Sequence, residues 1–289
     1  MTEEEFPRRL TRRGALTAFI GAGATLALGC GNSSSTGGSD TEGGAGAGGT
    51  GTGGTKGSGG TTASEGGDCA VTAEGEIGPY FADDSDARFN RSNIVTNIDG
   101  TNAQTGIPLT LTVTIVDTEK ACAPYAGAQI DIWHCNSAGV YSDQSAENTT
   151  TESWLRGYQV TDDNGQVTFI TIIPGWYQGR TTHIHLRVRS TYSSASSTSD
   201  GTNTTQLFFD QTFVDTLATS VAPYSAEGKN STTNASDHVY TGETHGENLM
   251  TVSGDTTNGY AASVTIYLPI TSDGTSTTTG PTGGPPGGP

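Results

Sequence analysis

Five segments between residues 109 and 268 alternate apolar and polar side chains, and this pattern limits the possible folds more than any other feature of the chain. The segments are 109–115, 127–134, 166–172, 183–188 and 262–268. Successive side chains of a β-strand point to opposite faces, so a period of two predicts strands. Asn164-Gly165, directly before the third segment, is a strong hairpin signal. No long stretch repeats apolar residues every 3.6 positions, so we expect an all-β fold, a β-sandwich or a related barrel.

The composition separates this region from its flanks. The chain has 289 residues, 42 of them glycine, and its apolar share of 32% is below the roughly 45–50% of globular domains. Residues 31–68 are mostly Gly, Ser and Thr, and residues 271–289 are similar. Such segments bury too little apolar surface to repay their ordering entropy, so we expect a flexible linker and a disordered tail. Residues 69–270 then form one domain.

Residues 1–30 are predicted to be a targeting signal. Arginines precede an apolar run from Ala15 to Leu28, the arrangement of a secretory signal peptide. Arg12-Arg13 looks like part of a twin-arginine signal. Residues 26–30 resemble a bacterial lipobox that ends at Cys30, which would carry a lipid anchor. We therefore expect an exported protein: a cell-surface or periplasmic lipoprotein or, if Cys30 is not modified, a secreted protein.

An oxidising compartment permits disulfides. Besides Cys30, the chain has Cys69, Cys122 and Cys135. Cys122 lies just before one expected strand and Cys135 at the end of the next, so we predict that these two are paired. Cys69 would be free or paired elsewhere, because spacing alone does not settle connectivity.

The net charge excludes some partners. The formal charge is −17 at pH 7. Binding to nucleic acid needs a basic face, so a nucleic-acid partner is not expected. The acidic chain also gains nothing from an anionic membrane surface.

Residues 174–186 form the densest group of chemically informative side chains. His183 and His185 are two positions apart in an expected strand, so both point to the same face. Two imidazoles on one face are a good beginning for a metal site. The alternative is two polar residues on a solvated strand face.

Two tyrosines lie in turns close to these strands. Tyr141 follows a glycine-containing turn after the second segment, and Tyr177 follows Pro174-Gly175, six residues before His183. Each could equally be an ordinary core or surface aromatic.

Four blocks in a fixed order carry a family resemblance. They are Gly78-Pro79-Tyr80-Phe81, residues 133–141, Arg156-Gly157-Tyr158-Gln159 and residues 174–185. Together they resemble the intradiol ring-cleavage dioxygenases, the catechol and protocatechuate 3,4-dioxygenase type, and most closely the exported single-domain branch. The resemblance covers about residues 78–209.

The resemblance implies one Fe(III) per chain, held by Tyr141, Tyr177, His183 and His185. It implies that Tyr177 is displaced when a catechol binds and accepts a proton as it leaves. It further implies cleavage of the ring by O2 between the two hydroxylated carbons, giving a cis,cis-muconate-type product. Phenolate and imidazole ligands suit such an iron centre better than the thiolates that favour zinc.

The same resemblance gives three further residues a role. Arg180 matches an arginine that stabilises developing negative charge, and Gln206 matches an active-site glutamine. Tyr80 is expected to line the substrate pocket, with packing as the alternative. His238 and His245 lie in a polar loop and receive no role.

Two other functions remain open at this point. One is an exported β-sandwich that binds a ligand without catalysis. The other is a different metalloenzyme, of the Fe(II) cupin or zinc type, built on His183 and His185. The substituents of the catechol ring and the oligomeric state are not predicted.

Overall fold

A computed structural model describes residues 69–190 and 203–270. The expected signal peptide, Cys30, the linker and the tail all lie outside these residues. Within the described ranges, no helix combines the length and the apolar character needed to cross a membrane.

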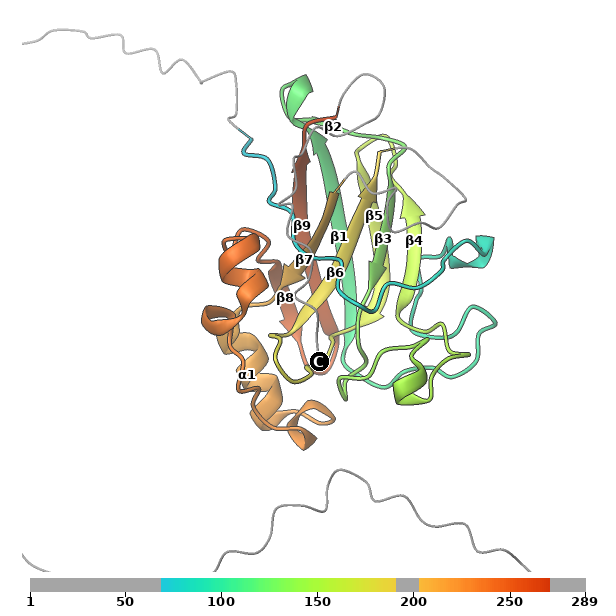
Figure 1. The fold of residues 1–289 in the computed structure, drawn as a ribbon, viewed down its shortest axis with the longest axis vertical. Helices are drawn as coiled ribbons and strands as arrows, with labels where there is room; N and C mark the ends of the chain where they lie inside the picture. Colours follow the sequence, from blue (N-terminus) through green and yellow to red (C-terminus); the bar gives the residue numbers. More distant parts are fainter. Residues whose placement is uncertain (1–68, 191–202, 271–289) are drawn as a thin grey trace, which may run out of the picture. The chain divides into compact units, whose positions relative to one another are not determined.

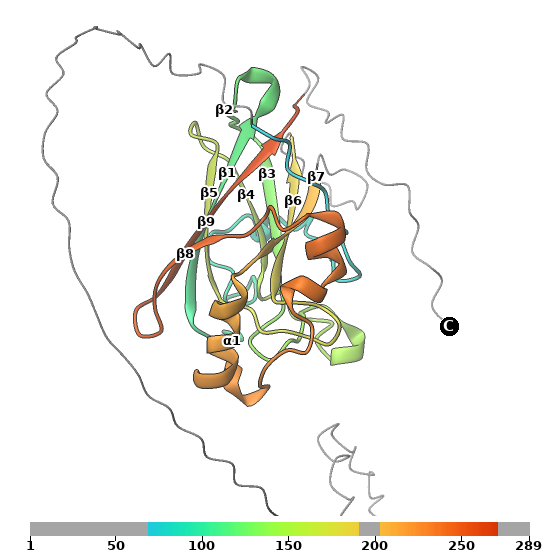
Figure 2. The same cartoon turned by 90° about the vertical axis from the view of Figure 1, so that its left-hand side faces the viewer.

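The described residues form two β-sheets, which confirms the all-β prediction. The larger sheet has the order β2-β1-β9-β8, and β5 also pairs with β1. The smaller sheet has the order β4-β3-β6-β7. Figure 2 shows β8, β9 and β1 in one layer and β3, β6 and β7 in the other. The strands are β1 Pro108–Asp117, β2 Ala123–Pro124, β3 Gln129–Trp133, β4 Arg156–Val160, β5 Gln166–Ile172, β6 His183–Arg189, β7 Asn203–Phe208, β8 Thr251–Asp255 and β9 Gly259–Leu268.

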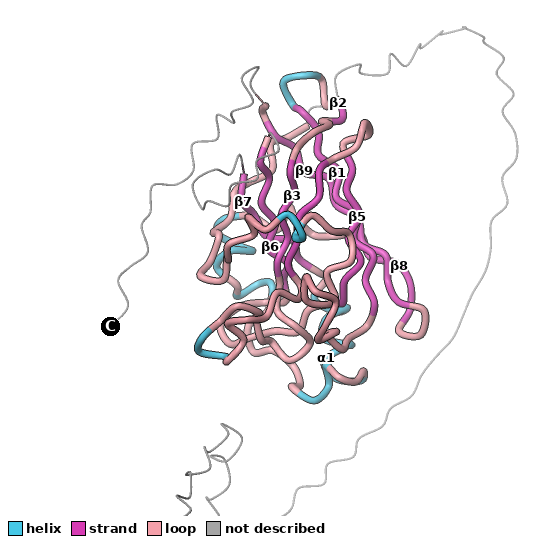
Figure 3. Tube along the Cα trace, turned by 90° about the vertical axis from the view of Figure 1, so that its right-hand side faces the viewer, coloured by secondary structure: helices cyan, strands magenta, loops and turns pink. Residues whose placement is uncertain are grey.

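The five strands expected from alternation are β1, β3, β5, β6 and β9. Four further strands, β2, β4, β7 and β8, and one helix, α1 Gln211–Ser220, were not expected. Short helical turns lie in the loops, many of which gather at one end of the layers, whereas the turn between β1 and β2 lies at the opposite end (Figure 3). The turns are η2 Ala87–Phe89, η3 Thr118–Lys120, η4 Ser145–Glu147, η5 Tyr224–Ala226, η6 Asn234–Ser236 and η7 Val239–Glu243.

The apolar core lies between the two sheets. Alternate residues of β1 and β6 face each other across it and are almost fully buried, namely Leu109, Leu111, Val113 and Ile115 from β1 and Ile184, Leu186 and Val188 from β6. Burying an aliphatic side chain contributes about 1.5–3 kcal/mol. This face of β6 therefore holds the sandwich together.

The opposite face of β6 is polar, yet it is also buried. It presents His183, His185, Arg187 and Arg189, none more than 2% exposed. The chain before β1 crosses this sheet (Figure 1), and the Phe81 ring lies 5.1 Å from the Arg187 guanidinium. The alternative that placed the two histidines on a solvated face is therefore wrong.

The predicted Cys122–Cys135 disulfide is also wrong. Cys69 bonds to Cys122, with 6.2 Å between their Cα atoms. Cys135 is buried, and its thiol points to the Gly175 carbonyl at 3.6 Å. Cys122 lies where β2 begins, and the chain through β3 advances roughly 20 Å before Cys135, at about 3.3 Å per residue. A disulfide spans less than about 7 Å between Cα atoms, so these two cysteines cannot meet.

Candidate metal centre

The two tyrosines and two histidines expected as ligands come together on the polar side of β6. The Nε2 atoms of His183 and His185 are 3.1 Å apart. The Tyr177 hydroxyl lies 3.3 Å from the Nε2 atom of His183. The Tyr141 ring centre is 5.7 Å from that of Tyr177 and 6.1 Å from that of His185. Residues from three separate parts of the chain thus face one small volume.

Glycines fix the two loops that carry the tyrosines. Gly139 has a positive φ of 78°, which favours glycine. A side chain there would overlap the carbonyl oxygen of Trp176, next to Tyr177. In the same way, a side chain at Gly175 would overlap the Ser137 carbonyl. The two loops therefore touch main chain to main chain.

Each histidine is oriented by its surroundings. The Nδ1 atom of His183 lies 2.7 Å from the carbonyl oxygen of Thr181, which can only accept. Nδ1 therefore carries the proton, and the Nε2 lone pair is available to a metal. The His185 ring stacks on Trp133 at 4.8 Å, nearly parallel, and a side chain at Gly78 would come within 3.1 Å of its Cε1 atom.

Burial sets the protonation of this group. It lowers the pKa of His183 to about 3, and the positive charge of Arg180 adds to the effect. Burial likewise places the pKa of His185 well below its ordinary value. It raises the pKa of both Tyr141 and Tyr177. At neutral pH both imidazoles are therefore neutral, the form that binds metals, and the two phenols need a cation to ionise.

The four side chains fit a ferric ion. The Tyr141 hydroxyl is buried and has no hydrogen-bond partner of normal geometry among the described residues, although it is near enough to Tyr177 to affect its pKa. A buried hydroxyl without a partner costs free energy, and a metal ligated by the oxygen would remove that cost. Two phenols and two neutral imidazoles form a donor set of oxygen and nitrogen without thiolate, which suits iron.

Comparisons with known proteins agree with this arrangement. Residues 77–249, more than half of the chain, match the family model described as Dioxygenase. The chain belongs to the intradiol ring-cleavage dioxygenase family.

Individual relatives support the same assignment. A catechol 1,2-dioxygenase from Candida albicans is 35% identical over 106 residues, 37% of this chain and 33% of that protein. The chain thus spans about a third of the length of this curated relative. The solved intradiol ring-cleavage dioxygenase from Tetranychus urticae is 27% identical, with a TM-score of 0.58, and the match covers 70% of this chain and 97% of that one. Another dioxygenase crystal structure is 28% identical, with a TM-score of 0.57, over 70% of this chain and 96% of the other.

Arg180 lies beside the tyrosine and histidine cluster, and its positive charge acts on His183. It is 7% exposed. Its Nε atom donates to Asp237 at 2.9 Å, and one Nη2 hydrogen bond goes to Gln206. Burial alone would lower the pKa of Arg180, but the hydrogen bond and charge of Asp237 raise it. The guanidinium is therefore charged and held in one position, and Gln206 is part of the same group.

Tyr80 lies against the cluster. Its ring stacks on Tyr141 at 4.2 Å and meets Tyr177 edge-on at 5.6 Å. Its carbonyl oxygen accepts a hydrogen bond from Arg156 at 2.6 Å. The position is compatible with both packing and lining a substrate pocket.

Three neighbours of the cluster were missed in the sequence. Asp237, buried, holds Arg180, and Glu76 reaches Arg180 from the solvent side at 3.3 Å. Arg156 donates to Ser142 and Tyr80 and lies 6.0 Å from the Tyr141 ring. Arg156 belongs to a block used for the resemblance, whereas nothing in the sequence around Asp237 or Glu76 indicated a contact with Arg180.

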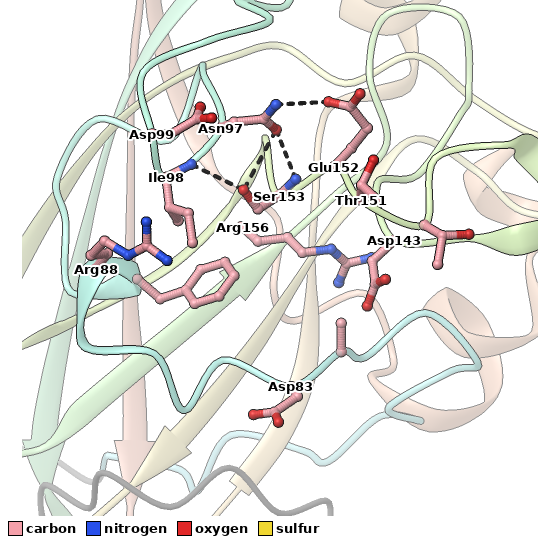
Figure 4. A pocket seen from close by; sticks show the side chains of 13 residues that line it. Asp83, Arg88, Asn97, Ile98, Asp99, Asp143, Thr151, Glu152, Ser153 and Arg156 are labelled. Atoms are coloured by element: carbon pink, nitrogen blue, oxygen red, sulfur yellow. Dashed lines mark hydrogen bonds between the residues drawn. The ribbon is translucent and has the colours of Figure 1, made fainter.

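A cavity of about 340 Å³ lies beyond Arg156 and contains none of the four expected ligands. Figure 4 shows polar side chains around it, several of them bonded to each other. Asn97 donates to Glu152 at 2.8 Å, and Ser153 accepts from the Ile98 amide at 3.0 Å. These bonds join the loop around Asn97 to the loop around Ser153.

Proposed function

We propose that the protein is an Fe(III)-dependent intradiol dioxygenase that cleaves catechol-type rings between the two hydroxylated carbons, with O2, to muconate-type products. The observation that carries the proposal is the meeting of Tyr141, Tyr177, His183 and His185 in one buried volume. These residues would hold one iron. When bound, ferric iron supplies a Lewis acid that ionises the catechol and lets the ring react with O2.

The two tyrosines differ in a way that suits different roles. Tyr141 is 2% exposed, whereas Tyr177 is only partly buried and lies on a loop next to the exposed Gln178 and Gly179. The more accessible phenol can move with less loss of packing. Tyr177 is therefore the better candidate to leave the centre and accept a catechol proton, while Tyr141 stays in place.

Arg180 would stabilise the negative charge that develops on the oxygens of the ring. A buried guanidinium that is already oriented by Asp237 loses little freedom when it acts. The aromatic rings of Tyr80 and Trp133 would exclude water around the reacting ring. A sandwich that only binds a ligand has no need for this combination of two tyrosines, two histidines and a clamped arginine.

The proposal is tested with iron-loaded protein. Tyrosinate on Fe(III) absorbs strongly in the visible range, so the protein should be red-brown, hold one iron per chain and consume O2 with catechol. Tyr141→Phe should lose both colour and oxygen uptake, whereas Tyr125→Phe, which alters a tyrosine bonded to the Ser190 carbonyl far from the cluster, should keep both. Colourless protein that takes up no iron would overturn the proposal.

We further propose that the protein is exported. The support is the targeting signal expected in residues 1–30 and the Cys69–Cys122 disulfide, since such bonds persist in oxidising compartments. A lipid on Cys30 would be detected by mass spectrometry of the membrane fraction, and Cys30→Ala should release the protein to the soluble fraction. Recovery of both forms from the cytoplasm would contradict export.

A further inference from the structure

Two carboxylates bind Arg180, although one would balance its positive charge. Asp237 binds it from the buried side with two contacts, from Nε at 2.9 Å and from Nη2 at 3.3 Å. Glu76 binds its Nη1 atom from the opposite side at 3.3 Å. Asp237 alone neutralises Arg180, so Glu76 adds a net negative charge next to the metal centre.

Two further titratable side chains lie next to Glu76. The Glu243 side chain accepts a hydrogen bond from the Glu76 amide at 2.7 Å, which brings a second carboxylate to the same place. His238 lies 3.4 Å from the Glu76 carboxylate. Ligand atoms of these three side chains lie within 4.8 Å of one another. Glu76 and His238 are exposed, so this group borders solvent.

The segment that follows Glu76 leads straight over the metal ligands. Gly78 packs on the His185 ring, and Tyr80 stacks on Tyr141. The Glu76 carbonyl also accepts from Gln206 at 3.0 Å. Glu76 is thus fixed at the solvent side of the site.

We propose that Glu76 makes this site select catechols by charge, favouring uncharged or cationic ring substituents and disfavouring carboxylated ones. An anionic substituent near Glu76 would meet the Glu76 and Glu243 carboxylates, and the charge of Arg180, the guanidinium that binds Glu76, is already balanced by Asp237. The inference rests on the proposed function and deepens it, because it names the substrate class of the same site.

The test uses three catechols of similar size, with an aminomethyl, a hydroxymethyl or a carboxymethyl substituent at the same ring position. For each, kcat/KM is measured by oxygen uptake and Kd by anaerobic calorimetry, for the iron-loaded wild type and for Glu76→Gln. Comparing variant with wild type on the same compound cancels differences in ring reactivity. Glu119→Gln removes an exposed carboxylate in η3, the turn between β1 and β2, and serves as the matched control.

We expect Glu76→Gln to improve the carboxymethyl compound relative to the hydroxymethyl one by roughly tenfold, the size expected of one partly screened charge at this range. The aminomethyl compound should become worse, and Glu119→Gln should change none of these ratios. In the wild type, added salt should reduce the preference, because Glu76 is exposed.

The outcomes separate the two proposals. If the wild type consumes none of the three compounds, the proposed function is wrong, and the calorimetric Kd values still test charge selection. If it consumes them but Glu76→Gln leaves the ratios as they were, the charge selection is wrong and the dioxygenase function stands. Equal shifts with Glu119→Gln would also overturn the inference, because they would show an effect of net charge alone.

Discussion

The two faces of β6 are both buried, yet they have different roles. Ile184, Leu186 and Val188 pack into the core between the sheets. His183 and His185, on the other face, meet the two tyrosines under the chain around Tyr80. An apolar face can be filled by any side chains of suitable volume, whereas the polar face needs particular atoms at particular places. Because side chains alternate along β6, one face contributes to the stability of the fold and the other provides side chains of the candidate site.

The largest effect is expected from a substitution that alters only the polar face of β6. His183→Ala removes a proposed nitrogen ligand of the iron, so oxygen uptake with catechol should fall by at least about 1000-fold, equivalent to about 4 kcal/mol in the barrier. Bound iron, measured by elemental analysis, should fall as well. The unfolding midpoint of the iron-free protein should change little, since His183 is not part of the apolar core. A variant that kept its iron and its activity would refute the ligand assignment.

The next largest effect is expected from a substitution that alters only the apolar face of β6. Leu186→Ala leaves a cavity in the core and should lower the free energy of unfolding by about 3 kcal/mol, as measured by urea titration. Its iron content and kcat at temperatures where it is folded should stay near those of the wild type. Loss of iron in the folded variant would show that the two faces are not independent.

A smaller effect is expected when the chain segment that crosses the polar face of β6 loses its disulfide. The Cys69–Cys122 bond ties the start of the described chain to the β1–β2 end of the larger sheet. Its removal in the double variant Cys69→Ser, Cys122→Ser should lower the free energy of unfolding by about 2 kcal/mol. Hydrogen exchange should rise in residues 69–84 and less in β6. Cys135→Ala, which keeps the disulfide, is the control, and equal exchange in both variants would contradict this role.

The smallest effect is a dependence on pH. Burial alone would raise the pKa of Asp237, but the hydrogen bond from Arg180 holds it below its ordinary value. The native state therefore gains stability from the ionised carboxylate above about pH 4, and this gain is lost as the pH falls through the lower native pKa. Urea titrations at pH 6 and pH 3 should show the loss in the wild type and in Leu186→Ala, and a smaller loss in Asp237→Asn. The same loss in all three would argue against Asp237 as its source.

The difference between the faces also explains what the sequence could predict. Alternation reveals a strand when apolar residues line one face, so β1, β3, β5, β6 and β9 were expected. In β7 the chain reads Asn203-Thr204-Thr205-Gln206 before its first apolar residue, and three of these four polar residues are buried. Such a strand shows no regular alternation of apolar and polar residues. The helix α1 was missed for another reason, because ten residues span fewer than three turns.

The site itself was predictable where residues lie close together along the chain. Tyr177, Arg180, His183 and His185 fall within nine positions, and the turn before Tyr141 has its own pattern. Asp237 and Glu76 reach Arg180 from sequence separations of 57 and 104 residues. Only the folded chain brings them together, and the same holds for the pairing of Cys69 with Cys122.

The main-chain contact between the two tyrosine loops has a consequence for engineering. Since Gly139 and Gly175 set the spacing of the loops through backbone atoms, the distance between Tyr141 and Tyr177 does not depend on most side chains of those loops. Gln178, exposed and directly after Tyr177, can then be randomised in a library while the four proposed iron ligands keep their places. Under the proposed function, the preference for different catechols can then change without loss of the ring-cleavage reaction.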